Sequence, residues 1–220
     1  MNPFQQYLEL KEGYRYFDTK ESLRRMQVLR SITLNSGENG RQIAFDMLGS
    51  INFGIVEENS DIDLVLYHSC DSHNEEHASG EDCPLILGIK DTVEAEVRKN
   101  LGDVKIEFLD ILNLTTLKTV SHSIPSAWPE NDQVVRFLFY RLIGRPVNRP
   151  LLHGLLHKFT QNPELMDRFD ALGSDFMEYF LKTGSHQHSF YKYNERIKNQ
   201  GLALPWKLKQ DFNNYLNIKS

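Results

Sequence analysis

Two aspartates stand one residue apart at the start of an apolar run. Asp61 and Asp63 flank Ile62 and are followed by the residues Leu-Val-Leu-Tyr. In a strand, residues i and i+2 point to the same face, so both carboxylates would project toward one spot. Each carboxylate raises the cost of ionising the other, and a partly buried pair needs a cationic partner. The pattern therefore predicts a site for a hard divalent cation such as Mg²⁺, which binds carboxylate and phosphate oxygens.

A glycine and a serine lie upstream of this pair. Gly49-Ser50 ends the short apolar run 43–48, which is predicted to be a strand that enters a tight turn. At such a turn a small residue lets the backbone approach a phosphate group, to which N–H and hydroxyl groups can donate. Gly49 and Ser50 are therefore candidates for phosphate binding.

A third carboxylate is expected on the next strand, over residues 104–109, which alternates apolar and polar residues. Glu107 is the first candidate, and its alternative interpretation is an exposed residue paired with Lys105 or another surface lysine. Asp110 is the weaker candidate, because it has the opposite parity in that strand and would point to the other face.

Taken together, these residues resemble a known signature. Gly49-Ser50, ten intervening residues and then Asp61-Ile-Asp63-Leu-Val are similar to the motif of the DNA polymerase β-like nucleotidyltransferase superfamily. The resemblance implies a small, non-polymerase member in which Gly49, Ser50 and Ser60 bind the nucleotide. It also implies that Asp61, Asp63 and Glu107 are the catalytic residues and hold two Mg²⁺ ions.

The reaction implied by the resemblance is Mg²⁺-dependent transfer of a nucleoside monophosphate, with AMP favoured, from an NTP to a hydroxyl group. The acceptor would be a small molecule or a protein, and pyrophosphate would be released. Two departures from the motif keep a second interpretation open: a glutamate at position 107 where aspartate is commoner, and no basic residue in Ile51-Asn52-Phe53. In that interpretation the chain is a catalytically weak module that binds a partner protein, as antitoxins do.

The composition of the chain disfavours several classes of binding partner. The chain has 220 residues with a net charge of −5 and no dense Lys/Arg block, which disfavours nucleic acid as a partner. No apolar run of about 18 residues occurs, so no membrane span is expected. Only two cysteines, Cys70 and Cys83, are present, which suits a reducing cytoplasm. No Walker-type glycine-rich motif occurs, which argues against a P-loop NTPase.

The elements that must position these residues divide the chain in two. Residues 1–115 read as a nucleotidyltransferase-like α/β domain, with helices expected after Asp18 and after Asp91. Residues 116–220 carry apolar residues at helical spacing and read as a C-terminal helical domain. The predicted fold class is α+β: a small mixed-sheet nucleotidyltransferase domain followed by an α-helical bundle.

Three further features are left as open questions by the sequence. The histidines and cysteines of the polar loop 68–83 match no closed zinc spacing, so metal binding there is undecided. One of the arginines between residues 136 and 149 could reach a triphosphate, although helix-surface charges are the commoner outcome. Tyr191 and Tyr193 could line an acceptor pocket between the two halves. The oligomeric state is not indicated.

Overall fold

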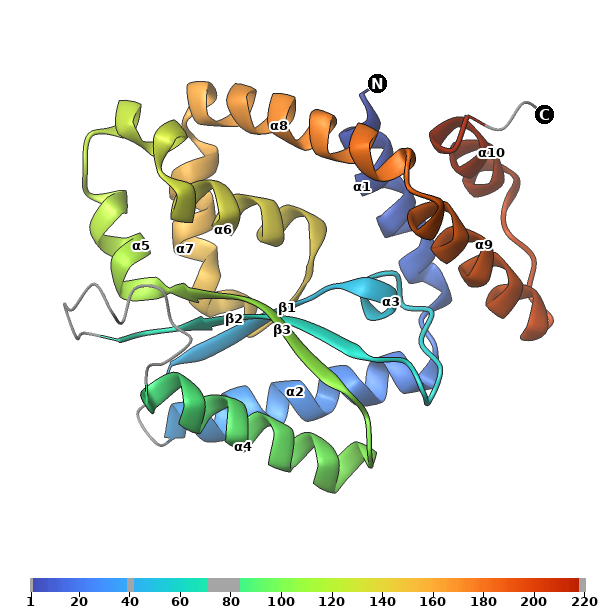
Figure 1. Ribbon diagram of the computed structural model, residues 1–220, viewed down its shortest axis with the longest axis horizontal. Helices are drawn as coiled ribbons and strands as arrows, with labels where there is room; N and C mark the ends of the chain where they lie inside the picture. Colours follow the sequence, from blue (N-terminus) through green and yellow to red (C-terminus); the bar gives the residue numbers. More distant parts are fainter. Residues whose placement is uncertain (1, 39–41, 71–83, 218–220) are drawn as a thin grey trace.

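The computed structural model describes residues 2–38, 42–70 and 84–217. Its centre is a four-stranded mixed sheet that has the strand order β3-β2-β1-β4 (Figure 1). β2 pairs antiparallel with β1 and parallel with β3, and β1 pairs antiparallel with β4. The strands are β1 (Ile43–Met47), β2 (Ile62–His68), β3 (Ile106–Asn113) and β4 (Arg145–Val147). The predicted α+β class, with a small mixed sheet, is confirmed.

Helices cover both faces of the sheet (Figure 1). Within the described residues, one face is covered by α2 (Lys20–Glu38) and α4 (Pro84–Leu101). The opposite face carries a thicker helical layer. Its members are α1 (Pro3–Tyr14), α5 (Leu114–Ser121), α6 (Asp132–Ile143), α7 (Arg149–Thr160), α8 (Pro163–Leu181), α9 (Gly184–Asn199) and α10 (Trp206–Tyr215).

The alternation of side chains along β2 explains this division. Ile62, Leu64 and Leu66 are fully buried in the cluster that α2 and α4 complete. Val65 and Tyr67 point the other way, into the larger cluster formed with the helical layer. Because residues two apart share a face, Asp63 lies on the side of the helical layer. The sheet therefore presents its candidate site residues to the second half of the chain.

The two halves of the sequence exchange segments in space. Helix α1 packs against α8 and α10, so the first residues of the chain belong to the helical layer. Strand β4, which follows α6, completes the edge of the sheet beside β1. The predicted division of the chain into two domains at residues 115/116 stays a prediction. The helical layer contains α1 from before this point, and the sheet contains β4 from after it.

Several boundaries differ from the sequence-based expectations. α2 continues to Glu38 and includes Asn35, Ser36 and Gly37, residues that are typical of turns. α4 begins at Pro84, seven residues before the expected Asp91 cap. β4 was not foreseen, because proline disfavours strands; Pro146 is tolerated at an edge strand, where a position that faces away from the neighbouring strand needs no N–H donor.

Two remaining expectations concern metal binding by the polar loop 68–83 and the absence of a membrane-spanning helix. His73, His77 and Cys83 lie outside the described residues, so the question of metal binding by the loop 68–83 stays a prediction. Within the described ranges, none of the helices combines the length and the apolar character needed to span a bilayer.

Candidate nucleotide and metal site

Gly49 lies directly against the carboxylate of Asp63. β1 ends at Met47, and Gly49 opens the single-turn helix α3 (Gly49–Asn52) with a φ of +62°. The backbone N–H of Leu48 donates to the carbonyl oxygen of Asp63 at 2.9 Å, which ties the turn to β2. A Cβ atom placed on Gly49 would lie 2.2 Å from Oδ2 of Asp63. The predicted phosphate turn and the predicted metal ligand are thus neighbours.

Asp63 carries an unfavourable negative charge in this position. Burial raises the pKa of its carboxyl, and the nearby carboxylates of Glu107 and Asp61 raise it further, while Lys105 lowers it. Within the described residues, no hydrogen bond or ion pair reaches the Asp63 side chain. A partly buried carboxylate that is repelled by two others is stabilised by a cation.

Glu107 stands beside Asp63 in the sheet. β2 and β3 run parallel, and the register pairs Asp63 with Glu107. Side chains that are paired in this way project from the same face, so the predicted neighbourhood of the two carboxylates is present. The Glu107 side chain is 51% exposed, and its Oε2 lies 3.4 Å from Nζ of Lys105. The alternative pairing with Lys105 is therefore also present.

The expected orientation of Asp110 is wrong. A register shift between Leu64 and Val65 leaves Leu109 as an extra residue in β3, so Asp110 pairs with Val65. An extra residue of this kind reverses the parity of the residues that follow it. Asp110 consequently points to the same face as Glu107.

The carboxylate of Asp110 already has partners. Nη1 of Arg136 donates to its two oxygens at 2.8 and 2.9 Å, and the hydroxyl of Tyr140 interacts with it. Its side chain is only 13% exposed. Glu107 is half-exposed, and its single contact with Lys105 is longer than the contacts that Arg136 makes with Asp110. A mostly buried carboxylate neutralised by an arginine is the poorer metal ligand, which leaves Glu107 as the better third candidate.

Asp61 and Ser60 lie in the loop that leads into β2. Asp61 is exposed and precedes the first residue of the strand. Ser60 shapes the loop, because its Oγ accepts a hydrogen bond from the N–H of Glu57 at 3.1 Å. That bond gives Ser60 a structural role beside the nucleotide contact predicted for it.

Arg25 holds this loop from α2. Its side chain is fully buried and donates to the carbonyl oxygens of Ser60 (2.6 Å), Glu58 (2.9 Å) and Glu57 (3.1 Å). Nε of Arg25 also donates to Glu21 at 2.8 Å. Nothing in the sequence pattern marked Arg25, inside the helix expected after Asp18, as a buried residue.

The donor set suits Mg²⁺ in kind. The ligands that this ion prefers are carboxylate oxygens, which Asp61, Asp63 and Glu107 offer. A cation would also neutralise the uncompensated charge of Asp63. Within the described ranges, however, no three His, Cys, Asp or Glu side chains are gathered closely enough to hold a metal ion. Asp61 and Glu107 would have to turn toward Asp63 when a cation binds.

Comparison of the chain with models of protein families, with curated proteins and with solved structures gave no match. The functional argument therefore rests on the residues and their geometry.

A second acidic residue on the sheet, Asp46, is part of a buried network. It is fully buried on β1, where Nη1 of Arg141 donates to Oδ1 at 2.5 Å and the hydroxyl of Tyr67 donates to Oδ2 at 2.6 Å. Burial raises the pKa of Asp46 to about 6, although Arg141 and Tyr67 lower it. This network joins β1 and β2 to α6 and leaves Asp46 committed to structure.

The arginines that could have reached a triphosphate are mostly committed as well. Arg136 binds Asp110 and Arg141 binds Asp46, as described above. Arg145 binds both carboxylate oxygens of Asp18 at 2.6 Å. Of the four candidates, only Arg149 is exposed. These internal pairs could not be told from surface charges in the sequence, because the partners lie 26 to 127 residues away.

A cavity of about 370 Å³ opens at Gly49, between the sheet and the helical layer. The helices α1, α6, α8 and α9 supply most of its wall, and Leu109 of the β3 bulge supplies another part. Tyr193 lines this cavity, as predicted for an acceptor pocket between the halves. Tyr191 is not among the lining residues; its ring packs edge-on against Phe212.

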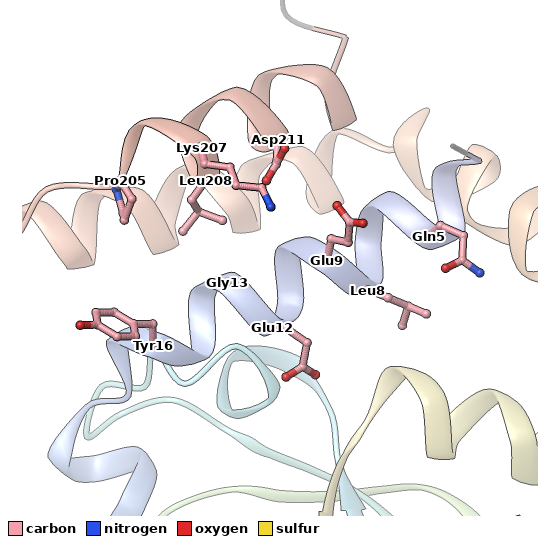
Figure 2. A pocket seen from close by; sticks show the side chains of 10 residues that line it. All are labelled: Gln5, Leu8, Glu9, Glu12, Gly13, Tyr16, Pro205, Lys207, Leu208 and Asp211. Carbon is pink, nitrogen blue, oxygen red and sulfur yellow. The ribbon is translucent and has the colours of Figure 1, made fainter.

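A larger hollow of about 650 Å³ lies elsewhere, between α1 and α10 (Figure 2). It is an open groove, and Figure 2 shows Leu208 of α10 above Gly13 of α1. A Cβ atom on Gly13 would lie 2.7 Å from Leu208 Cδ1, so this glycine permits the close approach of the two helices. None of the candidate site residues lines the groove, and we do not assign the chemistry to it.

Proposed function

We propose that the protein is a Mg²⁺-dependent nucleotidyltransferase that moves a nucleoside monophosphate, with AMP favoured, from an NTP to an acceptor hydroxyl. The observation that carries the proposal is the contact between Gly49 and the carboxylate of Asp63, with Glu107 in register beside it. A phosphate-binding turn and a partly buried, unneutralised carboxylate then serve a single ligand, a metal-bound triphosphate. Neither the left-handed backbone of Gly49 nor the unneutralised charge of Asp63 has an evident structural reason.

In the proposed reaction, the acceptor oxygen forms a bond to the α-phosphorus while the bond from that phosphorus to the bridging oxygen of the β-phosphate breaks. Pyrophosphate leaves, and the hydroxyl proton passes to a carboxylate, for which Glu107 is the candidate. Gly49 and Ser50 would hold the phosphates through backbone N–H and hydroxyl groups. Asp61, Asp63 and Glu107 would hold two Mg²⁺ ions, and bound Mg²⁺ would supply neutralisation of the charge on the phosphates.

The first test is binding of the nucleotide. Mg²⁺ with a non-hydrolysable ATP analogue should raise the melting temperature of the protein, because a ligand that binds only the native state stabilises it. Neither component alone should reproduce the full shift. Asp63→Asn should lose the response, and Asp175→Asn, an exposed aspartate on α8, should keep it. An equal response from Asp63→Asn would refute the assigned site.

The second test is transfer. Each α-labelled NTP is incubated with the protein, Mg²⁺ and a cell extract, and the label is followed into small molecules and into protein. This experiment reports the preferred base and the class of acceptor together. The predicted result is a labelled product that depends on Asp63 and Mg²⁺.

One observation favours the alternative function. The ion pair between Glu107 and Lys105 and the exposure of Asp61 leave the three carboxylates apart. A catalytically weak module that binds a partner protein, as an antitoxin does, would retain the fold without assembling the site. Binding of Mg²⁺ and nucleotide without any transfer to an extract component would favour this function.

A further inference from the structure

The cavity at Gly49 is strongly apolar. Its wall holds eight phenylalanine and tyrosine rings, together with aliphatic side chains and His186. The Phe53 ring lies 5.0–5.7 Å from the rings of Tyr7, Phe190 and Tyr193, and these contacts are mostly edge to face. Its volume of about 370 Å³ falls at the lower end of the range typical of small-molecule sites, roughly 300–1,000 Å³.

No formal charge lines this cavity. Among the described residues of its wall there is no Asp, Glu, Lys or Arg. Along this wall, the several ammonium groups of an aminosugar or the carboxylate of an acidic ligand would be buried without a counter-charge, which is strongly unfavourable; the carboxylate of Asp63 is adjacent only at the Gly49 end. The lining selects against charged acceptors.

Most polar groups of the wall already have partners inside the protein. The Tyr7 hydroxyl interacts with the side chain of Asn52, and the Tyr140 hydroxyl interacts with the carboxylate of Asp110. Nε2 of His186 lies 2.8 Å from the Tyr215 hydroxyl, and Ser189 Oγ donates to the carbonyl oxygen of Ser185 at 3.1 Å. A nucleobase would bury several donors and acceptors with few partners, whereas a hydrocarbon ring would bury none.

The end of the cavity that contains Gly49 is different, because it adjoins the carboxylate of Asp63. The phenol of Tyr193 is also close enough to Asp63 for the two groups to interact electrostatically, and its hydroxyl makes no hydrogen bond within the described residues. A ligand with an apolar body and one polar end would therefore place that end beside Gly49 and Asp63.

From these observations we infer that the cavity binds a neutral, ring-bearing alcohol or phenol, whose hydroxyl is the acceptor. This inference rests on the proposed nucleotidyl transfer for its chemistry. The acceptor oxygen takes the nucleoside monophosphate, pyrophosphate leaves and the hydroxyl proton goes to Glu107, so no further reactant is needed. The recognition itself requires neither nucleotide nor metal.

The test measures binding of the acceptor-like ligand in the absence of nucleotide and metal. The fluorescent probe naphthol is titrated into the full-length protein, and choline and an aminosugar with several ammonium groups are titrated in parallel. Ser189→Trp places an indole in the cavity and should weaken naphthol binding at least about tenfold by occupying its volume. Ser185→Trp, at an exposed position one helical turn earlier on α9, is the matched control and should leave the affinity unchanged.

Saturable naphthol binding that is weakened by Ser189→Trp and unchanged by Ser185→Trp supports the inference. Naphthol that stays bound when Mg²⁺ and ATP are added supports it as well. Three results would overturn it: no saturable binding of naphthol, equal binding by Ser189→Trp, or competitive displacement by ATP, which would make the cavity the base site. Tighter binding of choline or of the aminosugar would overturn it as well.

The outcomes separate the two proposals. Naphthol binding without any Mg²⁺-dependent ATP response would leave the cavity assignment standing and would refute the nucleotidyltransferase. Label transfer to an aminosugar or a protein, together with absent naphthol binding, would refute the acceptor class and leave the nucleotidyltransferase standing.

Discussion

The Cα atom of Gly49 and the carboxylate of Asp63 are packed so closely that no side chain fits between them. This contact joins the turn after β1 to the face of β2. The positive φ of Gly49 adds a second restriction, since L-residues other than glycine rarely adopt it.

Gly49→Ala should displace the Asp63 carboxylate and strain the turn. A displacement of about 1 Å at a site of this kind can lower activity on the order of 100-fold, and we expect such a loss of Mg²⁺-dependent ATP binding or turnover. Gly154→Ala, at an open helical position on α7, should instead stabilise the protein by about 0.5–1 kcal/mol. Calorimetry and nucleotide titration of both variants make the comparison. Equal nucleotide affinity in the two variants would count against the Gly49 contact.

Asp63→Asn should raise stability at neutral pH when no divalent cation is present. The pKa of Asp63 is raised in the folded protein, so its ionised form disfavours folding at pH 7. That cost shrinks as the pH falls through the raised pKa and is absent below the ordinary aspartate value of about 3.9. The difference in melting temperature between variant and wild type should therefore decrease as the pH is lowered. Exposed Asp175→Asn should show no such trend.

Arg25→Lys should loosen the loop that carries Ser60 and Asp61. A lysine cannot replace the several donors of the guanidinium, so carbonyl oxygens lose partners inside a buried site. We expect a destabilisation on the order of 3 kcal/mol in urea unfolding, together with weaker binding of Mg²⁺ and ATP. Arg24→Lys changes the neighbouring, half-exposed arginine and should cost less than about 1 kcal/mol. Similar losses in the two variants would contradict the role given to Arg25.

Arg141→Met should be among the more damaging single substitutions in the helical layer. It leaves the buried carboxylate of Asp46 without its cation, and breaking such a pair costs about 3–5 kcal/mol. The free energy of unfolding in urea measures the loss. Arg168→Met removes an exposed ion pair with Glu130 and should cost less than about 1 kcal/mol. A small effect of Arg141→Met would show that the network is weaker than its geometry suggests.

His186→Gln should make the protein more tolerant of acid. Burial lowers the pKa of His186 to about 4, whereas in the unfolded chain it is near 6.5. The unfolded state therefore binds more protons below pH 6.5, and stability falls as the pH drops from 6.5 to 4. Melting curves across this window should show a smaller loss for His186→Gln than for the wild type. His188→Gln, an exposed residue of the same helix, should behave as the wild type does.

The local elements around the candidate site could be predicted because short-range patterns specify them. The alternation in β2 and the glycine-serine turn placed Gly49 and Asp63 correctly, since both depend on residues that are near in sequence. Glu107 was preferred to Asp110 from the parity of its own strand, whereas the register that sets it beside Asp63 is visible only in the structure.

The bulge at Leu109 and the buried ion pairs could not be predicted in this way. One extra residue in β3 reverses the face of Asp110, and nothing in the alternation of residues 104–109 announces it. The partners of Arg141 and Arg145 lie 95 and 127 residues away, so their burial depends on tertiary packing. Arg25 is hidden for the same reason, because its acceptors are backbone carbonyl oxygens, which any sequence provides.

The exchange of segments between the layers has a consequence for unfolding. α1 is covered by helices from the end of the chain, and β4 protects the edge of β1. If the helical layer opened, the sheet would lose an edge strand and expose an unpaired ladder to other molecules. We therefore expect chemical denaturation to be a single cooperative transition by fluorescence and by circular dichroism. A fragment ending near residue 115 would lack β4 and should aggregate.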